Sequence, residues 1–195
     1  MKKLFKMLLL TYLLAAMPAR VMAESQEVLI HKIKKQLAEF KSLSGNFRQN
    51  RFVKSADLNL ESKGSFSFNL TSELVWHQRT PFIQDLTMTK EAITQKGPDG
   101  TGSTISKEQQ PQLFGFSNVL LSIFAGDVKV LKDNFEYTVT LEKKRWNMKL
   151  VAKDQLFKKL ISEINVAGDK FINSITVLEK SGNELKIYFS DIKGK

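Results

Sequence analysis

The sequence predicts a single α+β domain built from a long antiparallel sheet and a few helices. Segments in which apolar and polar side chains alternate recur along most of the chain, and this two-residue period is typical of half-buried strands. A helical repeat of apolar residues lies near the start, and one almost wholly apolar segment interrupts the strands in the middle. The 195 residues suffice for one well-buried core, and no linker or internal repeat divides them.

The start of the chain has the pattern of a cleaved signal peptide. Lysines are frequent in the first six residues, an apolar run follows at 7–17, and small residues in 21–23 precede Glu24. This apolar run is shorter than the roughly 20 residues that a membrane-spanning helix needs. We therefore expect residues 1–23 to be removed on export and residues 24–195 to form a single mature domain.

Composition excludes several classes of site. The chain has no cysteine, which rules out disulfides, thiolate metal ligands, cysteine nucleophiles and a lipid anchor on a cysteine of its own. Loss of Lys2, Lys3, Lys6 and Arg20 lowers the formal net charge from +10 to +6. Such a charge suits lipid headgroups or an acidic protein surface, or forms a plain solvated surface. The lysines are scattered, so we expect no nucleic-acid partner.

The first predicted element is an amphipathic helix within residues 24–41. Ile30, Ile33, Leu37 and Phe40 recur at helical spacing, and Ser25 is a suitable first cap. We expect the helix to pack on the domain by this apolar face. Its basic character also fits transient contact with a membrane surface.

Two strands and a hairpin follow. Residues 45–54 predict a strand in which Phe47 and Phe52 fall on opposite parities, so we expect a twist or a bulge. In the hairpin, 64–70 and 74–80 alternate apolar and polar residues on either side of a polar break. Pro81 cannot donate a ladder hydrogen bond and should end the second strand near Thr80.

The middle of the chain carries short strands, a loop and the apolar segment. Residues 82–88 and 91–95 predict strands, and 97–102 is a glycine-rich loop that lacks the lysine and hydroxyl residue of a phosphate-binding loop. Residues 111–125 predict a helix that is apolar around nearly its whole circumference and must be covered on nearly all sides. The concave face of a curved sheet would provide such a cover. Gly115 and Ser117 weaken this helix locally, which suits a segment that shifts when a ligand enters.

The remainder returns to strands. Two strands with one wet face are expected within 135–150, and a helical turn within 154–160. Three more strands are expected at 161–166, 171–179 and 185–191, joined by glycine-containing turns.

No group of residues predicts catalysis. His31 and His77 are the only histidines, and neither has a ligand or a nucleophile at a recognised spacing. We expect no catalytic residue, no metal site, no cofactor and no enzymatic activity. The 14 phenylalanines instead provide a large apolar surface, which would form either a cavity for acyl chains or a tightly packed core.

A set of short motifs spans nearly all of the chain after the signal peptide: Leu43 to Gln49, Lys63 to Phe68, Leu74 to Trp76 with Pro81, Gly126 with Asp127, Phe135, Trp146 to Leu150, Ile164 to Val166, Ile175 and Phe189. In these residues the sequence resembles the LolA family of periplasmic lipoprotein carriers. The resemblance implies a strongly curved, incomplete antiparallel barrel covered by helices. It also implies that acyl chains of a lipoprotein or lipid pass from an inner-membrane transporter to an outer-membrane acceptor, carried by a protein that we expect to be monomeric.

Eight residues are expected on the wall of the acyl-binding cavity: Phe47, Phe66, Phe68, Leu74, Trp76, Phe116, Leu120 and Phe124. The chain departs from the family at one place, because the Arg-Pro pair that precedes the tryptophan strand and whose arginine helps to hold the helical lid is absent. Arg79 lies on the far side of Trp76 and does not replace it. The alternative function is a periplasmic protein-binding or scaffold module with a packed core; a lipid hydrolase is a weaker third.

Overall fold

In the computed structural model, which describes residues 24–69 and 73–195, eleven strands form one antiparallel sheet in the order β6-β5-β4-β3-β2-β1-β11-β10-β9-β8-β7. The strands are β1 (Ser42–Val53), β2 (Leu58–Asn69), β3 (Glu73–Thr80), β4 (Gln84–Met88), β5 (Ile93–Lys96), β6 (Gly102–Ile105), β7 (Phe135–Glu142), β8 (Arg145–Ala152), β9 (Ile161–Gly168), β10 (Ile172–Glu179) and β11 (Glu184–Gly194). The helices are α1 (Gln26–Leu37), α2 (Pro111–Phe124), α3 (Val128–Asn134) and α4 (Gln155–Leu160), with a 3-10 turn at Lys54–Ala56. The expected α+β class is confirmed.

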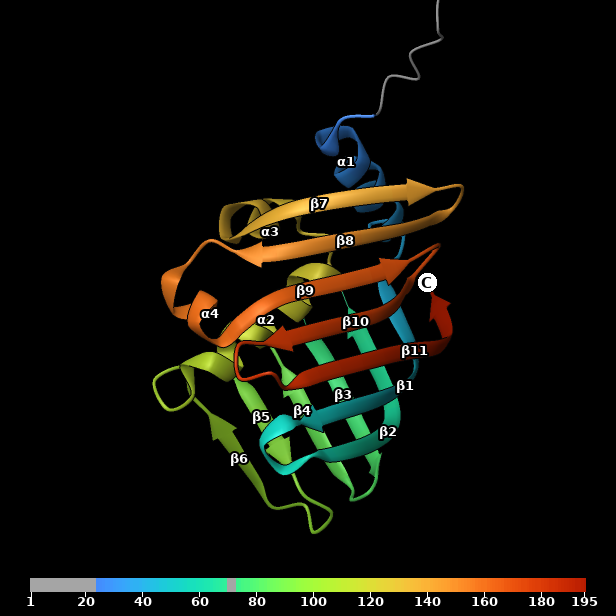
Figure 1. Cartoon of the computed structure of the whole chain (residues 1–195). Coiled ribbons are helices and arrows are strands. Elements are labelled where there is room, and N and C mark those ends of the chain that lie inside the picture. The colour runs from blue at the N-terminus through green and yellow to red at the C-terminus, as the bar shows by residue number, and fades with distance from the viewer. Residues whose placement is uncertain (1–23, 70–72) are drawn as a thin grey trace, which may run out of the picture.

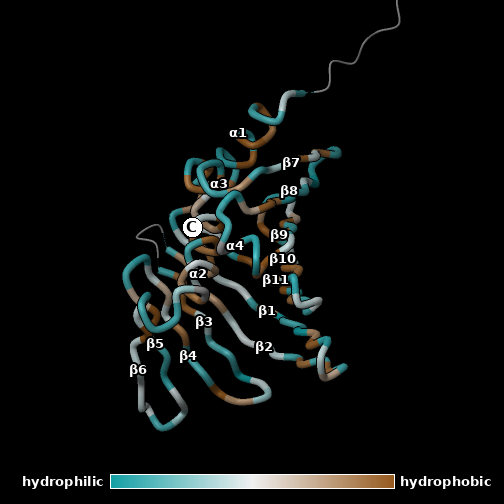
Figure 2. Tube along the Cα trace, turned by 60° about the vertical axis from the view of Figure 1, so that its left-hand side comes forward, coloured by the Kyte–Doolittle hydropathy of each residue, from teal (hydrophilic) through white to brown (hydrophobic). Residues whose placement is uncertain are grey.

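The sheet is strongly curved and encloses α2. Strands β7 to β11 form one wall and β1 to β6 the other, and α2 lies between the two walls (Figures 1 and 2). Strands β6 and β7 are the two edges and do not pair with each other, so hydrogen bonds do not close the sheet. This is the incomplete barrel that the resemblance implies. Helix α3 contacts β7, while α4 contacts β8 and β9.

The predicted central hairpin is present as β2 and β3. Phe66 pairs with Trp76 and Phe68 with Leu74, so all four side chains lie on the same, inner face of the sheet. Strand β3 ends at Thr80, directly before Pro81, as expected. Leu70 lies outside the described residues.

The irregularity expected in β1 has a different position. Pairing with β2 is continuous along the strand, and the register shift against β11 lies between Ser44 and Asn46 rather than between Phe47 and Phe52. Strand β1 alternates regularly through Phe52, which is half-buried on the outer face, opposite the buried Phe47. A single apolar residue on an outer face needs no bulge. The sequence analysis therefore predicted an irregularity in this strand but gave the wrong position for it.

Helix α1 packs on the domain by its apolar face, as the sequence predicts. The Ser25 hydroxyl oxygen accepts a hydrogen bond from the Val28 N–H at 3.4 Å and caps the first turn. The buried residues of the helix are Leu29, Ile30, Ile33 and Leu37. Ile30, Ile33 and Leu37 are thus on the buried face as predicted, whereas Phe40 lies beyond the end of the helix and is only partly buried.

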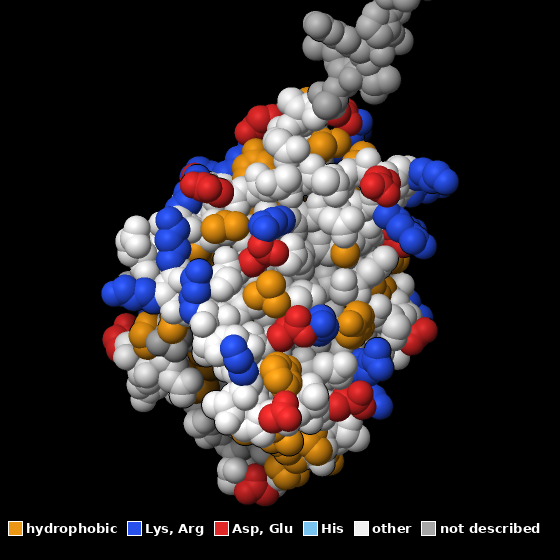
Figure 3. Space-filling model, in the orientation of Figure 1, with side chains coloured by type: hydrophobic (Ala, Val, Ile, Leu, Met, Phe, Trp, Pro, Cys, Tyr) orange, Lys and Arg blue, Asp and Glu red, His pale blue; other side chains and the backbone are white. Residues whose placement is uncertain are grey.

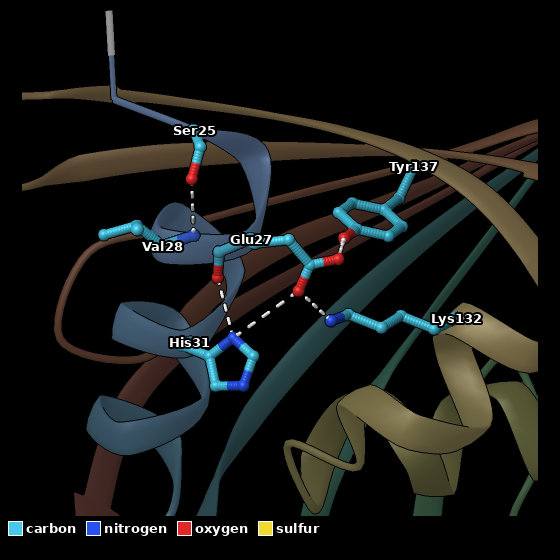
Figure 4. A network of polar contacts seen from close by, with 6 residues as sticks. All are labelled: Ser25, Glu27, Val28, His31, Lys132 and Tyr137. Carbon is cyan, nitrogen blue, oxygen red and sulfur yellow. Dashed lines mark hydrogen bonds and ion pairs between the residues drawn. The ribbon is translucent and has the colours of Figure 1, made fainter.

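The first turn of α1 covers an edge of the sheet. The Gln26 amide donates to the Val139 carbonyl at 3.0 Å and accepts from the Val139 N–H, which satisfies both groups on edge strand β7. Glu27 accepts from the Tyr137 hydroxyl at 2.8 Å and pairs with Lys132 of α3 (Figure 4). These contacts tie α1 to β7 and α3.

Two short elements are absent from the sequence prediction. Strand β6 is an exposed four-residue edge that follows the glycine-rich loop, and α3 is a seven-residue helix in which Asp127 accepts from the Val130 N–H at 3.2 Å. In the described part of the chain, no helix has the length and apolarity needed to cross a membrane. The predicted signal peptide, residues 1–23, lies outside the described residues.

Candidate functional site

Helix α2 has two apolar faces that meet different surroundings. Phe116, Leu120 and Phe124 are spaced by four residues and form one stripe of the helix, whereas Gly115, Asn118 and Ser122 lie on the opposite side, with Val119 at its border. The first stripe belongs to the face that meets the inner side of the sheet. The second lines a cavity.

An aromatic cluster covers the first face of α2. We use this name for Phe47, Phe66, Phe68, Trp76, Phe124 and Phe189. The Phe124 ring of α2 lies 5.4 Å from the Phe66 ring and 5.6 Å from the Phe68 ring, measured between centroids. Below it Phe47 stacks on Trp76 at 3.8 Å. Aromatic contacts of this kind are favourable beyond their buried area, so the cluster holds α2 against the sheet.

The structure brings the eight predicted site residues into one core. Five of them belong to the aromatic cluster, Leu74 and Leu120 are buried beside them, and Phe116 is partly buried against the same core. Phe189 of β11 completes the cluster and was missed as a site residue, although it continues the alternation of Leu185 and Ile187 along the predicted last strand.

A cavity of about 860 Å³ lies on the other face of α2. Its lining is mostly apolar and comes from α2, α3, α4 and the adjoining ends of β7 and β8: Phe114, Val119, Leu121, Val130, Leu131, Phe135, Ala152, Phe157 and Leu160. None of the eight predicted residues is in this lining. Their role as the wall of an acyl-binding interior remains a prediction.

Gly115 shapes this cavity. A Cβ atom at position 115 would lie 3.3 Å from the Phe157 ring, so glycine lets that ring approach α2. The Phe157 ring in turn packs edge-on against Phe135 at 5.7 Å. The weak helix former noted in the sequence therefore has a packing reason, because it makes room for a side chain of the cavity wall.

Helix α2 also carries a buried hydroxyl without a partner. Ser117 has no exposed surface, and its Oγ makes no hydrogen bond among the described residues. Ser122 differs, because its hydroxyl donates to the Asn118 carbonyl at 2.7 Å. An unpaired buried hydroxyl costs free energy, so α2 is held less firmly than its apolar contacts alone would suggest.

Charged side chains surround the cavity unevenly. Lys90, Lys107 and Lys159 are lining residues with exposed side chains, and Asp154 is the one carboxylate in the lining. The Asp154 carboxylate accepts from the Phe157 N–H at 2.9 Å and caps α4. The cavity therefore joins an apolar interior to a positively charged boundary.

Neither histidine lines the cavity beside α2, and His31 Nδ1 lies 2.7 Å from the Glu27 carbonyl oxygen within α1. His77 lies on the opposite face of β3 from Trp76, and its Nδ1 is 2.9 Å from the Asp85 carboxylate, which also accepts from Arg79 at 3.1 Å. The hydrogen bond with His77 lowers the pKa of Asp85 below its ordinary value. In the described residues, no three His, Asp or Glu side chains group to hold a metal ion.

Comparison with known proteins identifies the family. The family described as "Outer membrane lipoprotein carrier protein LolA" matches residues 38–195. A LolA superfamily protein from Nitrosomonas europaea is structurally similar over 89% of this chain and 94% of its own, with 10% identity and a TM-score of 0.49. No curated protein sequence matches the chain.

MucB is a second structural relative. Its structure is similar over 85% of this chain, with 12% identity and a TM-score of 0.51, but this chain spans only 58% of MucB. The Pseudomonas aeruginosa MucA/MucB complex gives 11% identity and a TM-score of 0.49 over 86% of this chain and 56% of that chain. At such identities the MucB likeness supports the fold alone. The family match covers well over half of the chain, and the protein therefore belongs to the LolA family.

Proposed function

We propose that this protein is a periplasmic carrier that shields acyl chains of a lipoprotein or lipid and ferries them from the inner to the outer membrane. The observation that carries the proposal is the apolar cavity of about 860 Å³ beside α2 in a chain of the LolA family. Its volume lies in the range of roughly 300–1,000 Å³ that is common for small-ligand sites.

The driving force for loading is burial of the acyl chain. Each methylene moved from water into an apolar site gains about 0.8 kcal/mol, so one chain gives a large favourable term. A neighbouring inner-membrane transporter would donate the cargo. Release then requires an outer-membrane acceptor with higher affinity, because the carrier itself gains nothing from nucleotide or metal chemistry in this scheme.

Movement of α2 away from the aromatic cluster would enlarge the binding space. A single chain fits the cavity on the α3 and α4 side of α2, whereas a cargo with several chains requires α2 to move away from Phe66 and Phe68. The eight predicted residues would then become the wall of the enlarged interior. The unpaired Ser117 hydroxyl and Gly115 support a helix that moves at low cost.

Opposite faces of α2 provide the test. We expect Val119→Trp, which fills the cavity, to weaken binding of a fluorescent single-chain fatty acid at least about tenfold. Phe116→Trp enlarges a side chain on the other face and is the matched control, with affinity within about twofold of wild type. Binding is measured by fluorescence titration, and circular dichroism checks the fold of each variant.

A second arm uses a triacylated lipopeptide. Phe68→Glu and Phe124→Glu place a charge on the wall proposed for larger cargo, so both should lower lipopeptide binding while the fold persists. The carrier proposal fails if wild-type protein binds neither probe saturably, or if filling the cavity and charging the aromatic cluster both leave binding unchanged.

A protein-binding role is the second candidate, and one surface favours it. Leu58, Leu60, Phe82 and Ile83 are exposed, and the pairing of Lys63 with Thr80 places them at the same end of the sheet. An exposed apolar patch of this kind suits a protein partner. This candidate predicts that Phe82→Ser abolishes capture of a partner but leaves acyl binding unchanged.

A further inference from the structure

Three lysines converge on the cavity from separate parts of the chain. Lys90 follows β4, Lys107 precedes α2 and Lys159 belongs to α4, yet all three line the same space. Their side chains are exposed, so the ammonium groups can lie at the boundary between the cavity and water while the stems follow apolar surface. Figure 3 shows Lys and Arg side chains along the left-hand edge of the molecule, over the region of α4.

The protein neutralises these three ammonium groups only in part, because Lys107 interacts electrostatically with the exposed carboxylate of its neighbour Glu108. Among residues 24–69 and 73–195, none of the three forms an ion pair with a carboxylate. The acidic neighbours in sequence, Glu91 and Glu108, are not lining residues. Lys132 and Lys149, away from the cavity, do pair with Glu27 and Glu163.

The one carboxylate of the lining does not offset this charge. Asp154 is held at the start of α4 by the Phe157 N–H, and it stands against three cations. A ligand that fills the apolar cavity would therefore bring its polar end into a region of net positive charge.

We propose that the ligand of this cavity is an anionic phospholipid, with its acyl chain inside and its phosphate headgroup beside Lys90, Lys107 and Lys159. This rests on the proposed carrier function and specifies the cargo that the preformed cavity accepts. A thioether-linked triacyl group carries no anionic headgroup, so it would bind without help from these lysines. Charge complementarity thus separates two kinds of acyl cargo.

The test compares two lysophospholipids with the same acyl chain. Lysophosphatidylglycerol is anionic, lysophosphatidylcholine is zwitterionic, and each is titrated below its critical micelle concentration into the purified exported protein at low salt. We expect about tenfold tighter binding of the anionic lipid. Each partly solvated ion pair contributes a small favourable free energy of binding, and the three contributions add. Raising the salt concentration should narrow this difference.

Charge-matched variants locate the effect. The triple variant Lys90→Gln, Lys107→Gln, Lys159→Gln should bind both lipids with the affinity that wild type shows for the zwitterionic one. The control replaces Lys143 and Lys144, in the hairpin turn at the far end of β7 and β8, and the exposed Lys193 by glutamine, which removes the same charge. It should keep the tenfold preference.

The outcomes separate this inference from the carrier proposal. Equal binding of the two lipids by wild type, or an unchanged preference in the cavity triple variant, would overturn the headgroup assignment while acyl binding itself still supports a carrier. Failure of both lipids and of a triacylated lipopeptide to bind would overturn both proposals.

Discussion

Ser117 places an unpaired polar group inside the apolar core. Its hydroxyl is wholly buried in α2 and makes no hydrogen bond among the described residues, while the positions around it are apolar. Removing a buried hydroxyl that has no partner relieves a desolvation cost, and alanine is also a better helix former than serine. Ser117 therefore lowers the stability of the helix that separates the cavity from the aromatic cluster.

We expect Ser117→Ala to raise the free energy of unfolding by about 1 kcal/mol, measured by urea denaturation. Ser122→Ala is the matched control, since it removes a hydroxyl that donates to Asn118 and should give no such gain. A loss of stability in Ser117→Ala would show that this hydroxyl has a partner and that α2 is held more firmly than we propose.

For single residues, the sequence predicts which side chains of the hairpin lie on the inner face of the sheet, but not which side of α2 meets the sheet. Alternation in 64–76 is sufficient to place Phe66, Phe68 and Trp76 on one inner face, because a strand has a fixed two-residue period. Helix α2 offers no such guide, since it is apolar on nearly all sides. Which stripe meets the sheet and which lines the cavity depends on tertiary packing against the sheet, α3 and α4, which the apolar pattern of α2 alone does not show.

Among the elements, α1 depends on a charged contact outside its apolar face. The hydrogen bond from Lys132 lowers the pKa of Glu27 below its ordinary value of 4.5, and the hydrogen bond from the Tyr137 hydroxyl acts in the same direction. A carboxyl whose pKa is lower in the folded state stabilises the fold fully above its unfolded pKa. That contribution is lost as the pH falls through the lower, folded value.

We therefore expect α1 to loosen from β7 and α3 in acid. Hydrogen exchange of the α1 amides should quicken between about pH 5 and pH 3, beyond the intrinsic change in rate, and Glu27→Gln should remove this pH dependence. Glu24→Gln is the control, because Glu24, just before α1, pairs with Lys32 within α1 and not with β7 or α3. Identical pH profiles for wild type and Glu27→Gln would exclude a role for the carboxylate in docking α1.

Elements with strong periodicity were predicted well, and weak or short ones were not. The helix of 24–41, the central hairpin and the last three strands all have clear periods and are present. Strand β6 was missed because four residues, three of them exposed, carry too little pattern. Helix α3 was missed because its two turns are rich in valine and lysine and have no clear helical period. Tertiary contacts with α2 and β7 stabilise it as a helix.

At the scale of the whole molecule, helix α2 has a packed aromatic cluster on one side and a cavity on the other. The curved sheet surrounds α2, and one face of the helix packs against the aromatic cluster while the other faces a cavity of about 860 Å³. The sequence left a cavity and a packed core as alternatives. The structure contains both, on opposite sides of the same helix.

Under the proposed function, the cavity would accept an acyl chain directly, and movement of α2 would enlarge the interior for a larger cargo. Closure of the sheet by hydrogen bonds would work against such a change, and β6 and β7 leave the barrel unclosed. The central claim is therefore that the molecule holds acyl chains in its interior during its working cycle.

Native mass spectrometry of the protein recovered from the periplasmic fraction of its own host tests this claim most directly. We expect a population whose mass exceeds that of the processed chain by one acylated molecule, and denaturing extraction should release that molecule for identification. A protein that is recovered only at the mass of the processed chain, and that stays at this mass after incubation with lipopeptide and fatty acid, would contradict the account.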